Sequence, residues 1–156
     1  MKRLLVVLGC MALASFVAAG AQAARSVTIH LVEKQVAFNF VDNPPRQGFE
    51  SAPLLGDQFA FTSELVTRAG KHAGHLGAVC TVTRGGDSGI ATCTGTFFLK
   101  GGQIALIAGI KLSSNRSSIA IVGGTGVYEG ASGSILSVQH GENGDVSDDT
   151  IHLILP

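Results

Sequence analysis

The spacing of apolar residues constrains the fold of this chain more than any other feature. Short segments alternate apolar and polar residues, and glycine or polar turn residues separate them. No stretch of about 11 residues has an apolar stripe at helical spacing. The 21 glycines suit tight turns better than helix interiors. The alternating segments lie at about 27–40, 58–67, 75–84, 89–99, 103–112, 117–122, 132–140 and 149–155.

Eight short strands at regular spacing are typical of an all-β sandwich or barrel. Eight antiparallel strands can close on themselves, which removes exposed edges and leaves room for one small ligand. The first segment changes parity between Val32 and Val36, so we expect a bulge there. In the second segment, one face presents Phe59, Phe61, Ser63 and Leu65.

The first 23 residues have the layout of a secretory signal peptide. A basic start precedes the apolar run 4–20, and Ala21-Gln22-Ala23 supplies small residues before a cleavage point. A weaker alternative is lipoprotein cleavage before Cys10, which would leave too short an apolar segment. We therefore expect a secreted or periplasmic protein with one domain, residues 24–156.

Charge and hydropathy exclude two classes of partner. Loss of Lys2 and Arg3 with the leader leaves 9 basic against 11 acidic residues, without a basic stripe for a phosphate backbone. After the leader, no apolar run is long enough to cross a bilayer. Neither nucleic acid nor a membrane is therefore an expected partner.

The two remaining cysteines set a register. Cys80 and Cys93 lie symmetrically about Gly86-Asp87, which as a two-residue hairpin loop would place them directly opposite each other. Ala78 would then face Gly95. In an exported protein this arrangement favours a disulfide, with two free buried thiols as the alternative. Because no histidine stands at ligand spacing from either cysteine, we expect no metal site.

Two motifs resemble sites that their context excludes. Residues 86–89, Gly-Asp-Ser-Gly, match the nucleophile segment of chymotrypsin-like proteases, but that fold needs two barrels and a positioned His and Asp. Residues 119–133, IAIVGGTGVYEGASG, look like a dinucleotide-binding strand and turn. That site requires a helix to begin at the glycines, and two further glycines follow instead.

Four ordered blocks resemble the allene oxide cyclase and dirigent family of β-barrels. They are GDQFAFTSEL at 56–65, GH at 74–75 followed by GAVCT at 77–81, GGQI at 101–104, and AIVGGTGVYEGASG at 120–133. The resemblance implies an all-β, eight-stranded antiparallel closed barrel of calycin type, with an apolar cavity and assembly as a homotrimer. Its cyclases rearrange a bound epoxide without a cofactor, and its dirigent proteins orient reactive phenolic species.

Individual family residues transfer poorly to this chain. Cys80 matches a pocket-lining cysteine of the cyclases, and Ser63 stands where they have an asparagine. His30 is the nearest match to their first-strand glutamate. Ser132 replaces an arginine of the dirigent proteins. The expected pocket residues are therefore His30, Phe61, Ser63, Cys80 and Tyr128.

The two strand histidines have two readings. His30 and His152 lie on the first and last strands, which are neighbours in a closed barrel. They form either an acid/base pair inside the cavity or two outward polar residues between inward apolar ones, and the alternation favours the second. Tyr128 is expected at a barrel mouth, with its hydroxyl either free for a ligand or held structurally.

Three functions remain open from the sequence. The first is a cofactor-free cyclase, isomerase or stereo-directing protein for a small apolar or phenolic molecule. The second is a carrier without catalysis, and the third is a structural barrel with a filled interior. An open pocket with inward acidic or histidine side chains would favour chemistry, and a wholly apolar pocket would favour carriage.

Overall fold

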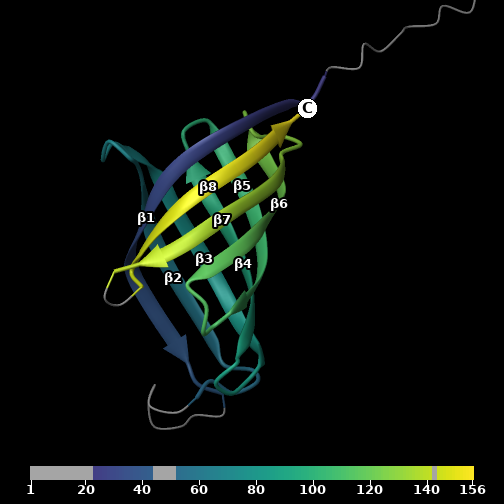
Figure 1. Cartoon of the computed structure of the whole chain (residues 1–156). Coiled ribbons are helices and arrows are strands. Elements are labelled where there is room, and N and C mark those ends of the chain that lie inside the picture. The colour runs from purple at the N-terminus through teal and green to yellow at the C-terminus, as the bar shows by residue number, and fades with distance from the viewer. Residues whose placement is uncertain (1–22, 44–51, 142–143) are drawn as a thin grey trace, which may run out of the picture.

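The computed structural model describes residues 23–43, 52–141 and 144–156, and the expected leader lies outside them. All eight predicted strands are present and form one closed antiparallel barrel in chain order (Figure 1). Their bounds are β1 (Arg25–Val41), β2 (Gln58–Thr67), β3 (His72–Arg84), β4 (Ile90–Leu99), β5 (Gly102–Lys111), β6 (Arg116–Gly126), β7 (Ser132–His140) and β8 (Val146–Leu155). The described residues include no helix that could span a membrane.

Closure depends on the long first strand, which pairs with both β2 and β8. A one-residue register shift between Gln35 and Ala37 confirms the expected bulge in β1. Because side chains alternate along a strand, the extra residue reverses the parity beyond it. Leu31 and Glu33 face inward before the bulge, and Phe38 and Phe40 line the interior after it.

The hairpin of β3 and β4 confirms the predicted cysteine register and disulfide. Cys80 lies opposite Cys93, and a disulfide joins them. The predicted two-residue loop is wrong, because the register shifts between Val82 and Arg84. The turn hydrogen bond runs from the Gly89 N–H to the Gly86 carbonyl oxygen, 2.8 Å away. The turn is therefore centred one residue later than the sequence symmetry indicates.

The glycine-rich segment forms the hairpin between β6 and β7, without a helix. Gly126 has φ 63° and Gly133 has φ 130°, both in the region that favours glycine. A Cβ atom on Gly133 would lie 2.0 Å from the His152 carbonyl oxygen. The absence of a side chain at Gly133 therefore lets β7 approach β8 closely. These glycines serve the pairing of barrel strands, and no helix begins at them as a phosphate site would require.

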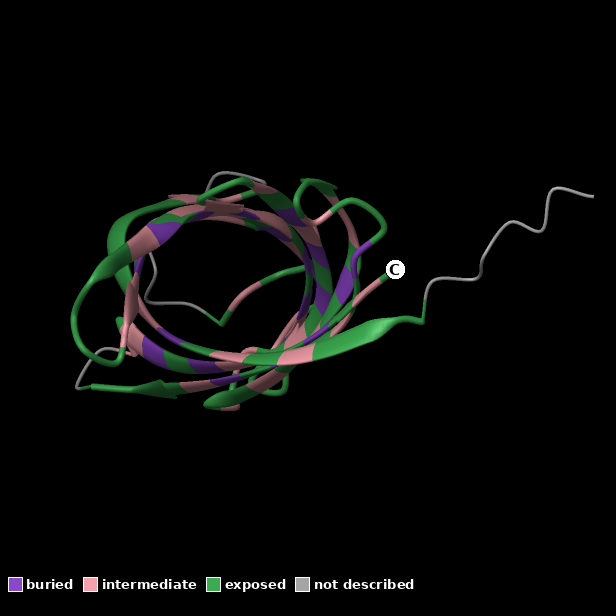
Figure 2. Ribbon diagram, turned by 90° about the horizontal axis from the view of Figure 1, so that it is seen from above, coloured by how far each residue is buried: buried purple, intermediate pink, exposed green. Residues whose placement is uncertain are grey.

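The main packing of the barrel interior lies in one half, and a smaller buried cluster surrounds the Cys80–Cys93 disulfide. Along the strands, buried and exposed bands alternate (Figure 2). The buried apolar side chains form one main cluster towards the end where both β1 begins and β8 ends. Its members are Leu31, Leu65, Leu76, Phe97, Ile104, Leu106, Ile121, Ala131, Ile135, Ile151 and Leu153. The other half of the interior holds a cavity.

Candidate functional site

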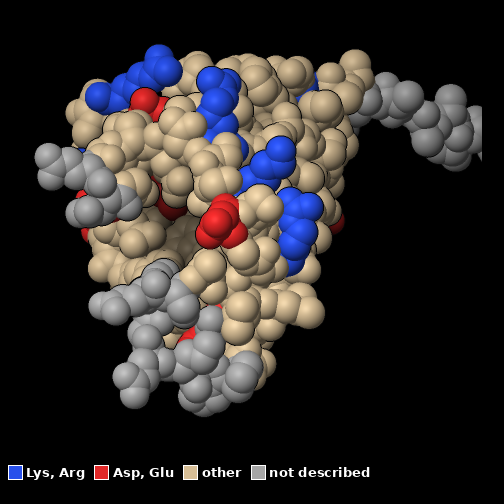
Figure 3. Space-filling view, turned by 60° about the horizontal axis from the view of Figure 1, so that its bottom comes forward, with Lys and Arg blue, Asp and Glu red and all other residues tan. Residues whose placement is uncertain are grey.

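The cavity has a volume of about 630 Å³ and is lined by residues from every strand and from several loops. The protein surface is hollowed at the end of the barrel that lies at the bottom of Figure 1 (Figure 3). Residues near the ends of strands, such as Phe40, Lys111 and Asp145, form part of the lining. A volume of this size is typical of sites for small organic molecules, about 300–1,000 Å³.

One wall of the cavity is aromatic. The inward residues beyond the β1 bulge are Phe38 and Phe40, and their partners on β2 are Phe61 and Phe59. The rings of Phe38 and Phe59 stack with centroids 5.9 Å apart, and those of Phe59 and Phe61 are 6.5 Å apart. Successive inward positions on two paired strands thus build a continuous aromatic surface.

The neighbouring wall is made of small side chains. Ala78 on β3 lies opposite Gly95 on β4, as predicted, and both line the cavity. Ala108 on β5 lies opposite Cys93 on β4, and both also contribute to the lining. Since the disulfide and these small residues occupy little volume, the space beside the phenylalanine rings stays open. A planar ring system can therefore enter this space and stack on the phenylalanine rings.

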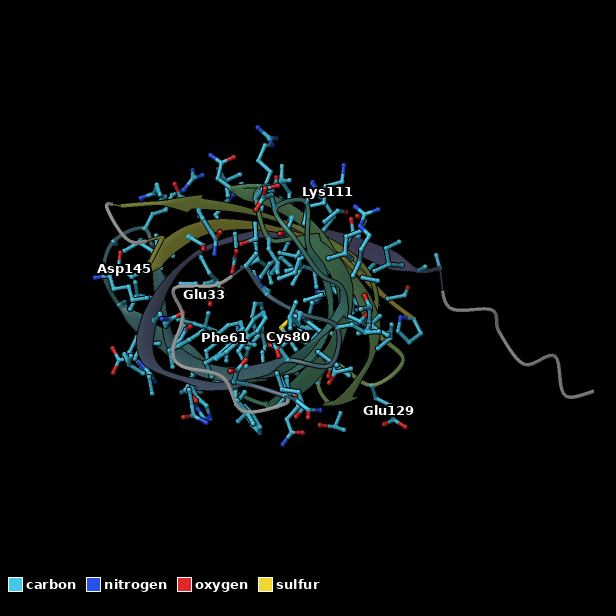
Figure 4. All side chains as sticks on the ribbon, turned by 90° about the horizontal axis from the view of Figure 1, so that it is seen from below. Glu33, Phe61, Cys80, Lys111, Glu129 and Asp145 are labelled. Atoms are coloured by element: carbon cyan, nitrogen blue, oxygen red, sulfur yellow. A yellow bond between two sulfur atoms is a disulfide. The ribbon has the colours of Figure 1, made fainter. Side chains whose placement is uncertain are left out.

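The inner end of the cavity is acidic. Glu33 lines the cavity from β1 and points towards the interior in the view up the barrel (Figure 4). Its carboxyl oxygen accepts a hydrogen bond of 2.7 Å from the hydroxyl of Ser63. Burial raises the pKa of Glu33 above its usual value of 4.5, and the Ser63 hydroxyl partly offsets that rise.

A second carboxyl group lies behind this end of the cavity. Asp149 is 2% exposed, and neither of its carboxyl oxygens has a well-formed hydrogen bond within the described part of the chain. Burial and, to a smaller extent, repulsion from Glu33 together raise the pKa of Asp149 to about 7, although a hydrogen bond from the Ser137 side chain partly offsets the rise. A buried carboxylate with so little hydrogen bonding is costly, so a carboxyl group in this position usually takes up a proton and becomes neutral.

Glu33 and Asp149 form a coupled pair. On the paired strands β1 and β8, Leu31 lies opposite Asp149 and Glu33 lies opposite Ser147, so the two acids are diagonal neighbours. Desolvation and mutual repulsion both disfavour double ionisation. The pair therefore retains a proton near neutral pH, in the range where a general acid or base works best.

Three of the predicted pocket residues lie in or beside the cavity. Phe61 lines it directly, and Ser63 is fully buried against Glu33. Cys80 is fully buried in the disulfide, and its partner Cys93 is the cysteine that faces the cavity. The disulfide thus occupies the position that the family resemblance assigned to a free pocket thiol.

The structure does not bring His30 or Tyr128 to the cavity. His30 is exposed on the outer face, where its Nδ1 lies 3.4 Å from Arg68 and 3.3 Å from Thr150. His152 is also exposed, so the outward reading of the two histidines is confirmed. Tyr128 packs beside the core cluster at the other end, and its hydroxyl lies 3.5 Å from the Lys100 carbonyl oxygen.

Sequence reasoning missed both interior acids. Glu33 shares the parity of Ile29 and Leu31, and Asp149 shares that of Ile151 and Leu153. That signal was available, because the same parity places His30 and His152 outside. Within the described residues, no group of three or more His, Cys, Asp or Glu side chains is arranged to hold a metal ion.

Solved structures with the same fold have several activities. Pyocyanin demethylase matches at 24% identity with a TM-score of 0.69, over 81% of this chain and 99% of its own. The pterocarpan synthase dirigent protein GePTS1 matches at 15% identity with a TM-score of 0.72, over 87% and 88%. The Diels–Alderase AbmU from Streptomyces koyangensis matches at 15% identity with a TM-score of 0.64, over 86% and 70%.

These likenesses confirm the fold that the sequence resemblance implied. The chain has the closed eight-stranded barrel fold of these dirigent, demethylase and Diels–Alderase structures. No family model matches the sequence, and a search of curated proteins found no match. Function must therefore be argued from the cavity and its residues.

Proposed function

We propose that the barrel binds one small, flat aromatic or phenolic molecule in its cavity and promotes a proton-dependent rearrangement of it without a cofactor. The observation that supports this most is an apolar cavity of about 630 Å³ that ends at two coupled carboxyl groups, the half-buried Glu33 and the buried Asp149. The phenylalanine wall orients the ligand and excludes water. Glu33 faces the ligand and exchanges the proton, and Ser63 holds its carboxyl group in place.

The proposed reaction needs no proton donor or acceptor other than the Glu33–Asp149 pair and the ligand. Protonated Glu33 donates to a basic atom of the ligand, and the resulting carboxylate recovers a proton when the product loses one at a neighbouring atom. Repulsion from Glu33 favours the protonated form of Asp149, so Asp149 acts as the proton reserve of the pair and does not need to touch the ligand. The net reaction is an isomerisation or cyclisation, in which no electrons are gained or lost.

The binding step is testable with a neutral fluorescent probe, N-phenyl-1-naphthylamine. Ala108→Phe adds a ring to the small-residue wall, and Ala120→Phe adds the same ring on the exposed outer face of β6. We expect enhanced probe fluorescence with the wild type and Ala120→Phe, and none with Ala108→Phe, provided circular dichroism shows both variants folded. Equal binding by Ala108→Phe would refute the cavity as the binding site.

Carriage without catalysis is the second candidate, because most of the lining side chains are aliphatic or aromatic. Native mass spectrometry of wild type and Glu33→Gln, each purified from the protein's own host, separates the two functions. A catalyst should release product as the wild type and retain unreacted substrate as Glu33→Gln. The same molecule in both proteins would support carriage.

Export and assembly are further parts of the proposal. A cleaved leader would deliver residues 24–156 to an oxidising compartment, where the Cys80–Cys93 disulfide is stable. Assembly as a homotrimer is supported by exposed apolar residues on the outer face of β3, β5 and β6, namely Val79, Ile107 and Val122. Mass determination of the leader-cleaved protein, denatured and native, tests both points.

A further inference from the structure

The charges at the inner end of the cavity are of one sign. Glu33 is half-buried and Asp149 is buried there, and the side chains that face them from the packed strands are uncharged. Asp148, on the outer face of β8, adds further negative charge to the environment of Asp149. The uncharged inward residues are Leu31 and Gln35 on β1, Ser63 and Leu65 on β2, Ile135 and Ser137 on β7, and Ser147 and Ile151 on β8.

Positive charge is confined to the mouth of the cavity. Among the described residues that line it, Lys111 is the one cation, and its side chain is exposed. Figure 4 places Lys111 and Asp145 at the edge of the barrel, whereas Glu33 and Phe61 lie towards its interior. Within the part of the chain that the structure describes, these two acids therefore have no cation beside them, a rare condition for carboxyl groups in an apolar interior.

The aromatic wall, like the two acids, favours a positively charged ligand. The faces of the phenylalanine rings are negative, and they attract cations more strongly when water is excluded. The inward residues of β1 follow one another in the order Glu33, Gln35 and Phe38. Gln35 pairs with Ser63 of β2, and Phe38 pairs with Phe61. A ligand stacked on these rings can thus reach Glu33 with one end.

We propose that the ligand of this cavity is a flat aromatic cation, such as a protonated or N-alkylated nitrogen heterocycle, with its positive charge placed against Glu33. The proposal rests on the proposed function and narrows it to one class of molecule. The ligand cation supplies the positive charge that the described residues do not place beside the two acids. The apolar ring system lies between the phenylalanine wall and the small residues Ala78 and Gly95.

Proton release follows from this arrangement. Below about pH 7 the acid pair holds a proton, and a bound cation favours its ionised form. Binding should therefore expel a proton from the pair, and affinity should rise with pH until the pair is already ionised. A neutral ligand of the same shape produces neither effect.

Two probes of nearly identical shape test the charge requirement, 10-methylacridinium and acridine at pH 8, where acridine is neutral. We expect the wild type to bind 10-methylacridinium at least tenfold more tightly than acridine in fluorescence titrations. Glu33→Gln should reduce that ratio to below about threefold. Glu64→Gln, the same change on the exposed outer face of β2, should leave the ratio intact.

Calorimetry of the wild type supplies a test that does not depend on a folded variant. At pH 6.5, titration with 10-methylacridinium in phosphate and in Tris should show release of about half a proton or more per ligand. Tighter binding of acridine, or of anthracene-9-carboxylate, would overturn the inference but leave the proposed function standing. If none of the three probes binds, the proposed function fails as well.

Discussion

Replacing Asp149 by asparagine should stabilise the barrel at neutral and alkaline pH. The carboxyl group has a folded-state pKa of about 7 and an ordinary value of 3.8, so the folded state binds more protons between these values. The contribution of Asp149 to the free energy of unfolding is therefore fully present below about pH 4. It is lost as the pH rises from about 4 through 7. The whole change in the pKa of Asp149, from 3.8 to about 7, corresponds to a loss of at most about 4 kcal/mol in the free energy of unfolding.

Asp149→Asn removes the ionisation and keeps the side-chain shape. At pH 8 the variant should be more stable than the wild type by about 2–4 kcal/mol, after allowance for the coupling to Glu33 and for the unpaired amide. At pH 4 the two proteins should differ by less than about 1 kcal/mol. The measurement is urea unfolding followed by circular dichroism at several pH values, with the disulfide kept oxidised.

The neighbouring residue provides the matched control. Asp148 lies on the outer face with its side chain 59% exposed, 3.3 Å from His140. Asp148→Asn should retain the fall in stability between pH 4 and pH 7. The reasoning is wrong if Asp149→Asn shows the same pH dependence as the wild type, or if wild-type stability is flat across this range.

Three other predictions concern the turns, the disulfide and the acid pair. Gly133→Ala should destabilise by at least about 2 kcal/mol, because its Cβ would meet the His152 carbonyl oxygen, whereas Gly109→Ala in open space should be nearly neutral in the same urea titrations. Replacing both disulfide cysteines by serine should cost about 3 kcal/mol, and equal stability of oxidised wild type and variant would contradict this. Ser63→Ala should raise the pKa of Glu33 further, which NMR titration of the carboxyl carbon would detect, and a lowered pKa would refute the role of the hydroxyl.

Much of the fold could be predicted because its determinants are local. Alternation fixes which side chains share a face, and glycines mark the turns, so all eight strands were found. The symmetric spacing of Cys80 and Cys93 gave their pairing correctly. The loop between them was misplaced because the register shift beyond Val82 leaves no mark in the spacing.

The acid site could not be recognised with the same ease. Parity alone puts Glu33 and Asp149 inside, but the general rule that carboxyl groups avoid apolar interiors makes an outward placement the default. Glu33 also precedes Lys34, so the pair resembles a solvated strand end. Whether the barrel is hollow depends on the combined volumes of inward side chains from strands far apart in sequence, such as Phe61 and Ala108. The alternation of apolar and polar residues along one strand does not indicate that combined volume.

The bulge in β1 determines which residues of the second half of that strand face the cavity. Before it, the strand contributes Leu31 and Glu33 to the interior, and after it Phe38 and Phe40. A further one-residue insertion just beyond the bulge would place Ala37 and Asn39 at the positions of those two rings while leaving the acid end unchanged. A single length change in one strand can therefore remove two rings from the aromatic binding surface without altering the packed half of the barrel.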